Sequence, residues 1–179
     1  MDASEGTDEL ADLFPKLATQ GFKIVEPPSD RYNCIAFAAG DTGAWWSIHS
    51  PDYWRAHATR SNRIANLVEV FAGLDFERCR NSRTEPDFGK VALYEQLRAW
   101  THAAVQTPQG TWLSNIGAGS VIEHDNPEAL TGGVGNPTNL HVMYLGNTKA
   151  DLGQPPTVIH GPVLHTGSRT SRCSNHRHC

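Results

Sequence analysis

Long apolar runs and basic leader segments are both missing from this 179-residue sequence. No stretch approaches the roughly 18 to 20 consecutive apolar residues of a membrane-spanning helix, so we expect no membrane partner. The first twenty residues are acidic and lack the basic start and apolar centre of a signal peptide. We therefore expect a cytoplasmic protein, without excluding delivery by another route.

Positive charge is also scarce. The chain has 15 lysines and arginines against 19 aspartates and glutamates, a net charge of −4 and a pI near 6.1. Proteins hold a nucleic-acid backbone mainly through positive charge, so the composition predicts no nucleic-acid partner.

The four cysteines do not suggest a disulfide framework, because they are scattered in a chain without an export signal. We expect reduced thiols. The last seven residues, Cys173–Cys179, contain metal-binding residue types but no second ligand pair at zinc-site spacing, so we predict no metal site there. The glycine-rich segments 117–119 and 132–135 do not join a strand to a helix, as a phosphate-binding loop must.

The most informative stretch that is present covers residues 30–46. Asn33 is a good N-cap, residues 35–39 are apolar and tolerate a helix, and Gly40 can end it, so the sequence predicts a short helix that begins at Cys34. Backbone N–H groups and the positive end of the dipole would stabilise a thiolate there and lower its pKa. Cys34 is therefore a candidate nucleophile, although an ordinary core cysteine would show the same pattern.

The remaining pattern predicts helices in the first half and an antiparallel sheet in the second. Helical spacing over residues 10–17 is interrupted by Pro15, and residues 60–72 form an amphipathic helix that Ser61 can cap. The expected strands are 22–25, 74–79, 90–94, 101–106, 111–116 and 141–145, with a helical turn at 127–130. We expect one α+β domain over residues 1–146 and a loose tail over residues 147–179.

A cysteine nucleophile needs an imidazole base, and the base needs a polar group that fixes its orientation. With Pro108 and Gln109 as a two-residue hairpin loop, His102 pairs with Asn115 on the next strand. A slip of one residue would bring Ser114 beside it instead. His102 is the expected base, and Asn115 or Ser114 the expected orienting group.

These segments resemble the NlpC-type papain-like peptidases and amidases. Residues 89–94, 101–106 and 110–114 are similar to the strand, base strand and third strand of that superfamily, with Tyr32–Cys34 at the nucleophile position. The resemblance implies a papain-like layout, with N-terminal helices packed on a small antiparallel sheet and chain order Cys, His, polar residue. It also implies that the third catalytic group falls on Ser114, where His, Asn or Asp is usual.

A closer resemblance covers roughly residues 22–133. The set of motifs YNCIAFAAGDT, KVALY, THAA, GxWxS and IEH is similar to a family of small uncharacterised bacterial proteins. That likeness brings no activity with it, so the mechanism is inferred from the remoter superfamily.

Four further residues are candidates for the site. His124 could be the third catalytic group or shape the pocket, or lie in a surface turn. The side-chain amide of Asn33 could donate to an oxyanion together with the backbone N–H of Cys34, or serve only as the N-cap. Trp45 and Trp46 could form a substrate wall or a packing lid over the helix.

The function that we expect is a cysteine-dependent hydrolase or acyltransferase that acts on the amide bonds of a peptide or small amide without a cofactor. One alternative is a non-catalytic binding domain that uses the Trp-rich segment. Another is a metal-dependent hydrolase using His102, His124 and His141, the last of which is also a reserve base.

Iodoacetamide labelling separates the enzyme from the binding domain. An activated Cys34 should react well below pH 8, and replacement of His102 should abolish that reaction. An ordinary buried thiol would show neither behaviour. The metal-dependent alternative would show stoichiometric zinc and loss of activity with a chelator.

Overall fold

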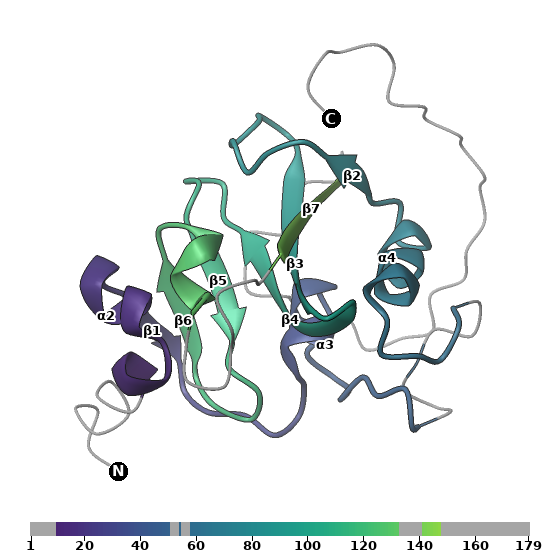
Figure 1. Cartoon of the computed structure of the whole chain (residues 1–179), viewed down its shortest axis with the longest axis horizontal. Coiled ribbons are helices and arrows are strands. Elements are labelled where there is room, and N and C mark those ends of the chain that lie inside the picture. Colours follow the sequence, from purple (N-terminus) through teal and green to yellow (C-terminus); the bar gives the residue numbers. More distant parts are fainter. Residues whose placement is uncertain (1–9, 51–53, 55–57, 133–140, 148–179) are drawn as a thin grey trace.

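The computed structural model of the chain describes residues 10–50, 54, 58–132 and 141–147, with only the backbone given for residues 141–143. Within these residues the fold is α+β, as expected: a seven-stranded sheet with a few short helices (Figure 1), in which all paired strands are antiparallel. Asn147, the first residue of the expected tail, instead ends a strand, whereas residues 148–179, with Cys173–Cys179 among them, lie outside the described residues. No helix within the described ranges has the length and hydrophobicity needed to cross a membrane.

The sheet order is β1-β6-β5-β4-β3-β7-β2. The strands are β1 (Lys23–Glu26), β2 (Glu77–Cys79), β3 (Gly89–Gln96), β4 (Ala99–Gln106), β5 (Trp112–Asn115), β6 (Val121–His124) and β7 (His141–Asn147). The helices are α2 (Pro15–Gln20), α3 (Cys34–Ala38), α4 (Ile64–Ala72) and the 3-10 helix η1 (Pro127–Leu130).

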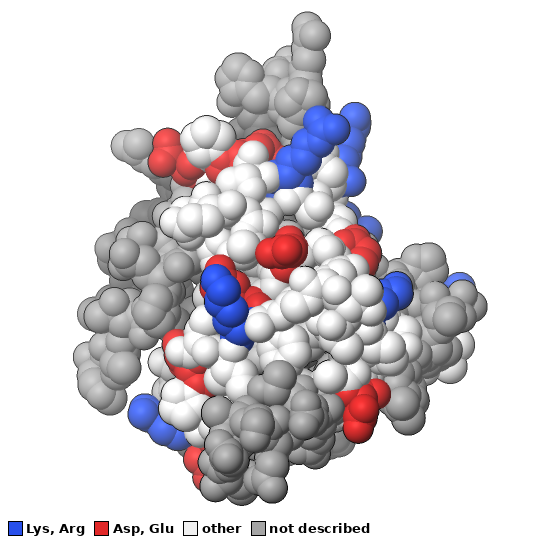
Figure 2. All heavy atoms as spheres, turned by 90° about the vertical axis from the view of Figure 1, so that its left-hand side faces the viewer, with Lys and Arg blue, Asp and Glu red and all other residues white. Residues whose placement is uncertain are grey.

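Each face of the sheet has its own apolar cluster. Helices α3 and α4 pack on one face, here called the α3 face, and α2 and η1 pack on the other, the α2 face. Side chains alternate along each strand, so Leu93 and Ala103 lie on the α3 face while Tyr94 and Ala104 lie on the α2 face. Acidic and basic side chains are interspersed over the side of the molecule seen in Figure 2.

Helix α3 forms where the sequence predicts it. The Asn33 side chain caps its start by accepting a hydrogen bond from the Ala36 N–H at 3.1 Å. Gly40, with φ of 79°, follows its end, and the Asp41 N–H donates to the Ala36 carbonyl at 2.8 Å. All five helical residues are buried, so tertiary packing holds a helix too short to be stable alone.

The two other predicted helices also form, with one correction. Pro15 splits the first pattern as expected: residues 10–13 are helical, and Pro15 starts α2. Ser61 does not cap α4, which begins at Ile64 with Arg63 in the N-cap position. Arg63 is extended there because its backbone forms a bridge with Ala99, and Ser61 instead accepts a hydrogen bond from the Arg63 N–H at 3.2 Å.

The register predicted for the hairpin between β4 and β5 is wrong by one residue. Gln106 pairs with Trp112 rather than residue 111, and the Thr107 N–H donates to the Thr111 carbonyl at 2.8 Å. Gly110 has a φ of 92°, a conformation that a non-glycine residue rarely adopts, and this allows a three-residue loop in place of the expected two. The slip moves Ser114 to the face on which Asn115 was expected.

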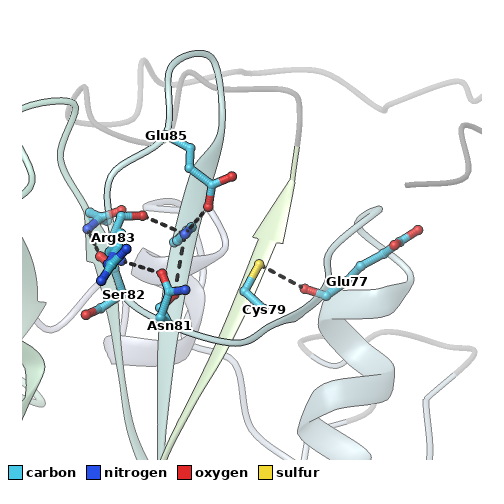
Figure 3. A network of polar contacts seen from close by, with 8 residues as sticks. Glu77, Cys79, Asn81, Ser82, Arg83 and Glu85 are labelled. Atoms are coloured by element: carbon cyan, nitrogen blue, oxygen red, sulfur yellow. Dashed lines mark hydrogen bonds and ion pairs between the residues drawn. The ribbon is translucent and has the colours of Figure 1, made fainter. Parts of the chain in front are cut away.

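A buried lysine holds the loop between β2 and β3. The Lys90 ammonium donates to the carbonyls of Arg83 at 2.6 Å and Asn81 at 3.4 Å, and lies 2.5 Å from the Glu85 carboxylate. Figure 3 shows Asn81, Arg83 and Glu85 of this loop, with dashed contacts that run inward from them. A fully buried cation is tolerated because every partner here is a carbonyl or carboxylate oxygen.

Replacement of this cation should destabilise the fold. Lys90→Met leaves the two carbonyls and the carboxylate without their donor, and we expect a loss of about 2–3 kcal/mol in the free energy of unfolding. Urea denaturation would measure it. The exposed Lys23→Met is the control and should change the unfolding free energy by less than about 0.5 kcal/mol. Equal midpoints for the two variants would contradict the assignment.

Candidate active site

Cys34 is the first residue of α3, and its side chain is 8% exposed. Helix α3 packs on β4, and Cys34 belongs to the same apolar cluster as Ala103. Three backbone N–H groups are close enough to the sulfur to lower its pKa: those of Ala103, Ile35 and Cys34 itself. Two of the three are the helix-start amides that the sequence predicted.

The predicted lowering of the Cys34 pKa is nevertheless wrong. Burial raises the pKa of the thiol to about 11, because desolvation of the thiolate outweighs the stabilisation by the surrounding N–H groups. Cys34 is therefore a neutral thiol at neutral pH, and the labelling with iodoacetamide well below pH 8 that an activated cysteine would show is no longer expected. A reaction at this sulfur would need a base that removes the proton during the attack.

At Ala103, β4 is no longer paired with its neighbour β5. The pairing of β4 with β5 includes Val105 with Leu113, but does not continue to the earlier residues of β4, although β5 extends to Asn115. The sulfur of Cys34 reaches the backbone of β4 in this part, which is paired with β3 but not with β5. It thus contacts the strand one residue after His102.

His102 lies opposite Tyr94 of β3, with ring centroids 5.2 Å apart, and its side chain therefore starts on the α2 face. Among the described residues no hydrogen bond joins it to Cys34, which packs on the α3 face. The Nε2 atom of His102 is buried and has no hydrogen-bond partner among these residues. Burial first, and repulsion from His124 second, lower the pKa of His102 to about 3, so the ring is neutral.

Ser114 and His124 are brought together on the α2 face. Their Oγ and Nε2 atoms are 2.9 Å apart, and the Nδ1 atom of His124 lies 2.8 Å from the Asn126 carbonyl. Both side chains are buried, and burial lowers the pKa of His124. The slip does place Ser114 on the same face as His102, but its hydrogen bond is to His124, and the Nε2 atom of His102 forms no hydrogen bond with it.

Asn115 lies on the other face from His102, since it follows Ser114 in β5 and pairs with Val121 of the α3-face cluster. Its Nδ2 atom donates to the Gly119 carbonyl at 3.5 Å, while its Oδ1 atom is buried without a partner among the described residues. The observed register therefore places Asn115, one of the two expected orienting residues, away from the His102 imidazole.

Asn33 and the tryptophans have mainly structural contacts. Both ends of the Asn33 amide are engaged, because its Nδ2 donates to the Trp46 carbonyl at 2.7 Å while its Oδ1 caps α3. Trp46 is buried and donates from Nε1 to Asp41 at 2.8 Å, whereas Trp45 is 39% exposed. The N-cap interpretation of Asn33 and the packing interpretation of Trp46 are the ones that these contacts favour.

No three His, Cys, Asp or Glu side chains in the described part of the chain lie close enough together to bind one metal ion. The side chain of His141 falls outside the described residues, so the reserve base and the three-histidine site stay predictions.

Sequence reasoning missed two contributors to the site. The Asn126 carbonyl fixes the proton of His124, and Tyr94 packs edge-on against the His102 ring while its hydroxyl donates to the Pro127 carbonyl at 2.8 Å. The first is a backbone carbonyl that a residue of any type could supply, so no residue pattern points to it. Tyr94 belongs to the KVALY motif, but only the strand register pairs it with His102.

Residues 23–141 match the family described as a domain of unknown function, DUF7689. The chain belongs to this family. The matched span runs from β1 to the first residue of β7 and includes Cys34, His102, Ser114 and His124. No curated protein and no solved structure matches the chain.

The raised pKa of Cys34 predicts its alkylation profile. In a chain whose other three cysteines are replaced by serine, the rate with iodoacetamide should be low at pH 7 and rise until about pH 11. In the urea-unfolded chain it should level off about two pH units lower, near the ordinary thiol pKa of 9.0. Because the folded-state pKa is the higher one, this thiol also stabilises the fold below pH 9, and that contribution is lost as the pH rises toward 11. An alkylation rate of the native chain that levels off by pH 8 would contradict the raised pKa of Cys34.

Proposed function

We propose that this chain is a cysteine-dependent hydrolase or acyltransferase that acts on amide bonds of peptides or small amides. Cys34 is the nucleophile and His102 the general base. One observation carries the proposal: the sulfur lies against the Ala103 amide, one residue from a histidine whose Nε2 atom is buried without a partner. A nucleophile type and a base type thus lie at neighbouring positions along the same strand, β4, but on opposite faces of the sheet and without a hydrogen bond between them.

The reaction begins from a neutral pair, because burial favours the uncharged forms of both groups. As the sulfur attacks the substrate carbonyl, the proton of the thiol passes to the imidazole, and the carbonyl π electrons move to its oxygen. Collapse of the tetrahedral intermediate breaks the C–N bond, the imidazole protonates the leaving amine, and a thioester on Cys34 remains. Water or an acceptor amine then releases the acyl group.

The backbone N–H of Cys34 is the oxyanion donor that we propose, because the Asn33 side chain is already engaged by Trp46 and Ala36. The reaction also requires the His102 ring, which starts on the opposite face of the sheet from Cys34, to leave its contact with Tyr94 and approach the sulfur along the part of β4 that β3 pairs but β5 does not. The partner strand β5 does not pair with that part of β4, so it does not fix the backbone on that side.

We also propose that the fold is papain-like and remotely related to the NlpC-type enzymes. Support comes from a helix that starts at the cysteine and packs on the strand that carries the histidine, with chain order Cys, His, polar residue. Ser114 takes the position where the superfamily has His, Asn or Asp. Helix α2 packs on the face opposite α3, so the N-terminal helices do not share one layer.

A Trp-rich binding surface receives less support. Trp46 and Trp54 are 4% and 6% exposed, so they contribute to the core rather than to a contact surface. Trp45 is the more exposed member of the group.

Acyl transfer to the full chain tests the proposal. With a p-nitrophenyl ester of an N-acylated amino acid as the probe, we expect one acyl group on Cys34, located by mass spectrometry after proteolysis. His102→Ala should slow the acylation about 10²–10⁴-fold because the proton acceptor is lost.

The exposed His49→Ala is the matched histidine control and should acylate at the wild-type rate. Cys34→Ala should show no acylation at this site. Equal rates for His102→Ala and His49→Ala would refute the proposed base, and acylation independent of Cys34 would refute the nucleophile.

A further inference from the structure

The hairpin between β3 and β4 ends in a tight turn that holds an apolar side chain in solvent. Gln96 pairs with Ala99, so Leu97 and Arg98 are the two central residues of the turn. The Leu97 side chain is 93% exposed, whereas the next most exposed large apolar residue among those described, Val25, is 44% exposed. A single exposed leucine is common on protein surfaces, so its exposure alone indicates no function.

The backbone of this turn is strained. The φ angles of Leu97 and Arg98 are 51° and 68°, both in the left-handed region. A two-residue hairpin turn with two positive φ angles prefers Asn-Gly or Asp-Gly, because these residues adopt the conformation at little cost. Leucine and arginine do not, so each adds conformational strain to the native state. The chain thus has leucine and arginine where asparagine and glycine would give a more stable turn.

Contacts at the base of the turn hold it against the start of α4. The Ile64 N–H donates to the Arg98 carbonyl at 2.8 Å, and the Trp100 N–H donates to the Asn62 carbonyl at 2.8 Å. The ring of Trp100 also stacks on Trp54, with centroids 6.4 Å apart. The exposed leucine is therefore carried by a turn that is fixed to the rest of the fold.

Positive charge lies beside the exposed leucine. Arg98 follows it in the chain, and Arg63 forms a backbone bridge with Ala99, the residue that closes the turn. Both arginine side chains are exposed, and neither forms an ion pair within the part of the chain that the structure describes. Anionic lipid surfaces attract this combination, because cations bind the headgroups while an apolar side chain enters the boundary with the acyl chains.

We propose that the hairpin tip, defined as Leu97, Arg98 and Arg63, is a docking site for an anionic lipid surface. Leu97 enters the headgroup layer, and the two guanidinium groups bind lipid phosphates. A protein partner fits the tip less well, because a stable protein interface buries about 800 Å² on each side, whereas a headgroup layer accepts one projecting side chain.

This contact is peripheral, so it needs no membrane-spanning helix, and the described residues contain none. It is also independent of the proposed reaction at Cys34. Two arginines and one leucine give weak, reversible binding, because each contributes only a small part of the free energy that stable anchoring needs.

Co-sedimentation of the full chain with lipid vesicles tests the docking site. We expect binding to vesicles of phosphatidylglycerol and phosphatidylcholine in equal parts, about tenfold weaker binding to vesicles of phosphatidylcholine alone, and loss of binding as salt is raised from about 0.05 M to about 0.5 M. Equal binding to both vesicles would overturn the proposal. So would no binding to the anionic vesicles, and a protein would then be the remaining class of partner.

A double substitution separates docking from folding. Leu97→Asn with Arg98→Gly gives the turn its preferred residues, so we expect the urea midpoint to rise while binding to the anionic vesicles falls about tenfold or more. Leu13→Asn removes a leucine that is 41% exposed elsewhere, and Arg31→Gln removes an exposed arginine outside the hairpin tip. Both controls should bind within about twofold of the wild type. A double variant that binds the anionic vesicles as the wild type does would refute the docking site.

Discussion

The packing of α3 on β4 is the constraint on which the site depends. A helix of five residues has no stability of its own, so the position of Cys34 is set by the core that buries the whole helix. Asn33 ties the helix start to the backbone of Trp46, and Gly40 lets the chain leave the helix at once. These contacts hold the sulfur against the backbone of β4 at Ala103.

This packing explains why the cysteine of the proposed pair is neutral, and burial on the other face of the sheet has the same effect on the histidine. Apolar surroundings hold the cysteine and bury the Nε2 atom of the histidine, and desolvation shifts each pKa toward the uncharged form. The helix-start N–H groups act in the direction that electrostatics predicts, but they are the smaller effect. A neutral thiol and imidazole resemble a serine–histidine pair in their proton transfer more than a preformed thiolate–imidazolium pair.

Local signals predicted the elements well, and tertiary contacts decided what the sequence left open. Capping by Asn33, the break at Pro15 and the positions of most strands along the chain could be predicted from residue types, because each depends on neighbours in the chain. The hairpin register could not, since it depends on whether Gly110 takes a positive φ. The degree of burial at Cys34, which reversed the direction of its pKa shift, likewise depends on residues far away in the sequence.

Gly110 also lies close to another part of the fold. A Cβ atom at this position would come within 2.6 Å of the Thr84 hydroxyl, in the loop that Lys90 anchors. The turn has therefore little room to change its shape. Its three-residue form places Ser114, rather than Asn115, on the same face of the sheet as His102. A two-residue turn closed by Thr107 and Gly110 would shift the register by one residue and exchange these two side chains without any substitution in the strands, so the length of this turn decides which of them shares a face with the histidine.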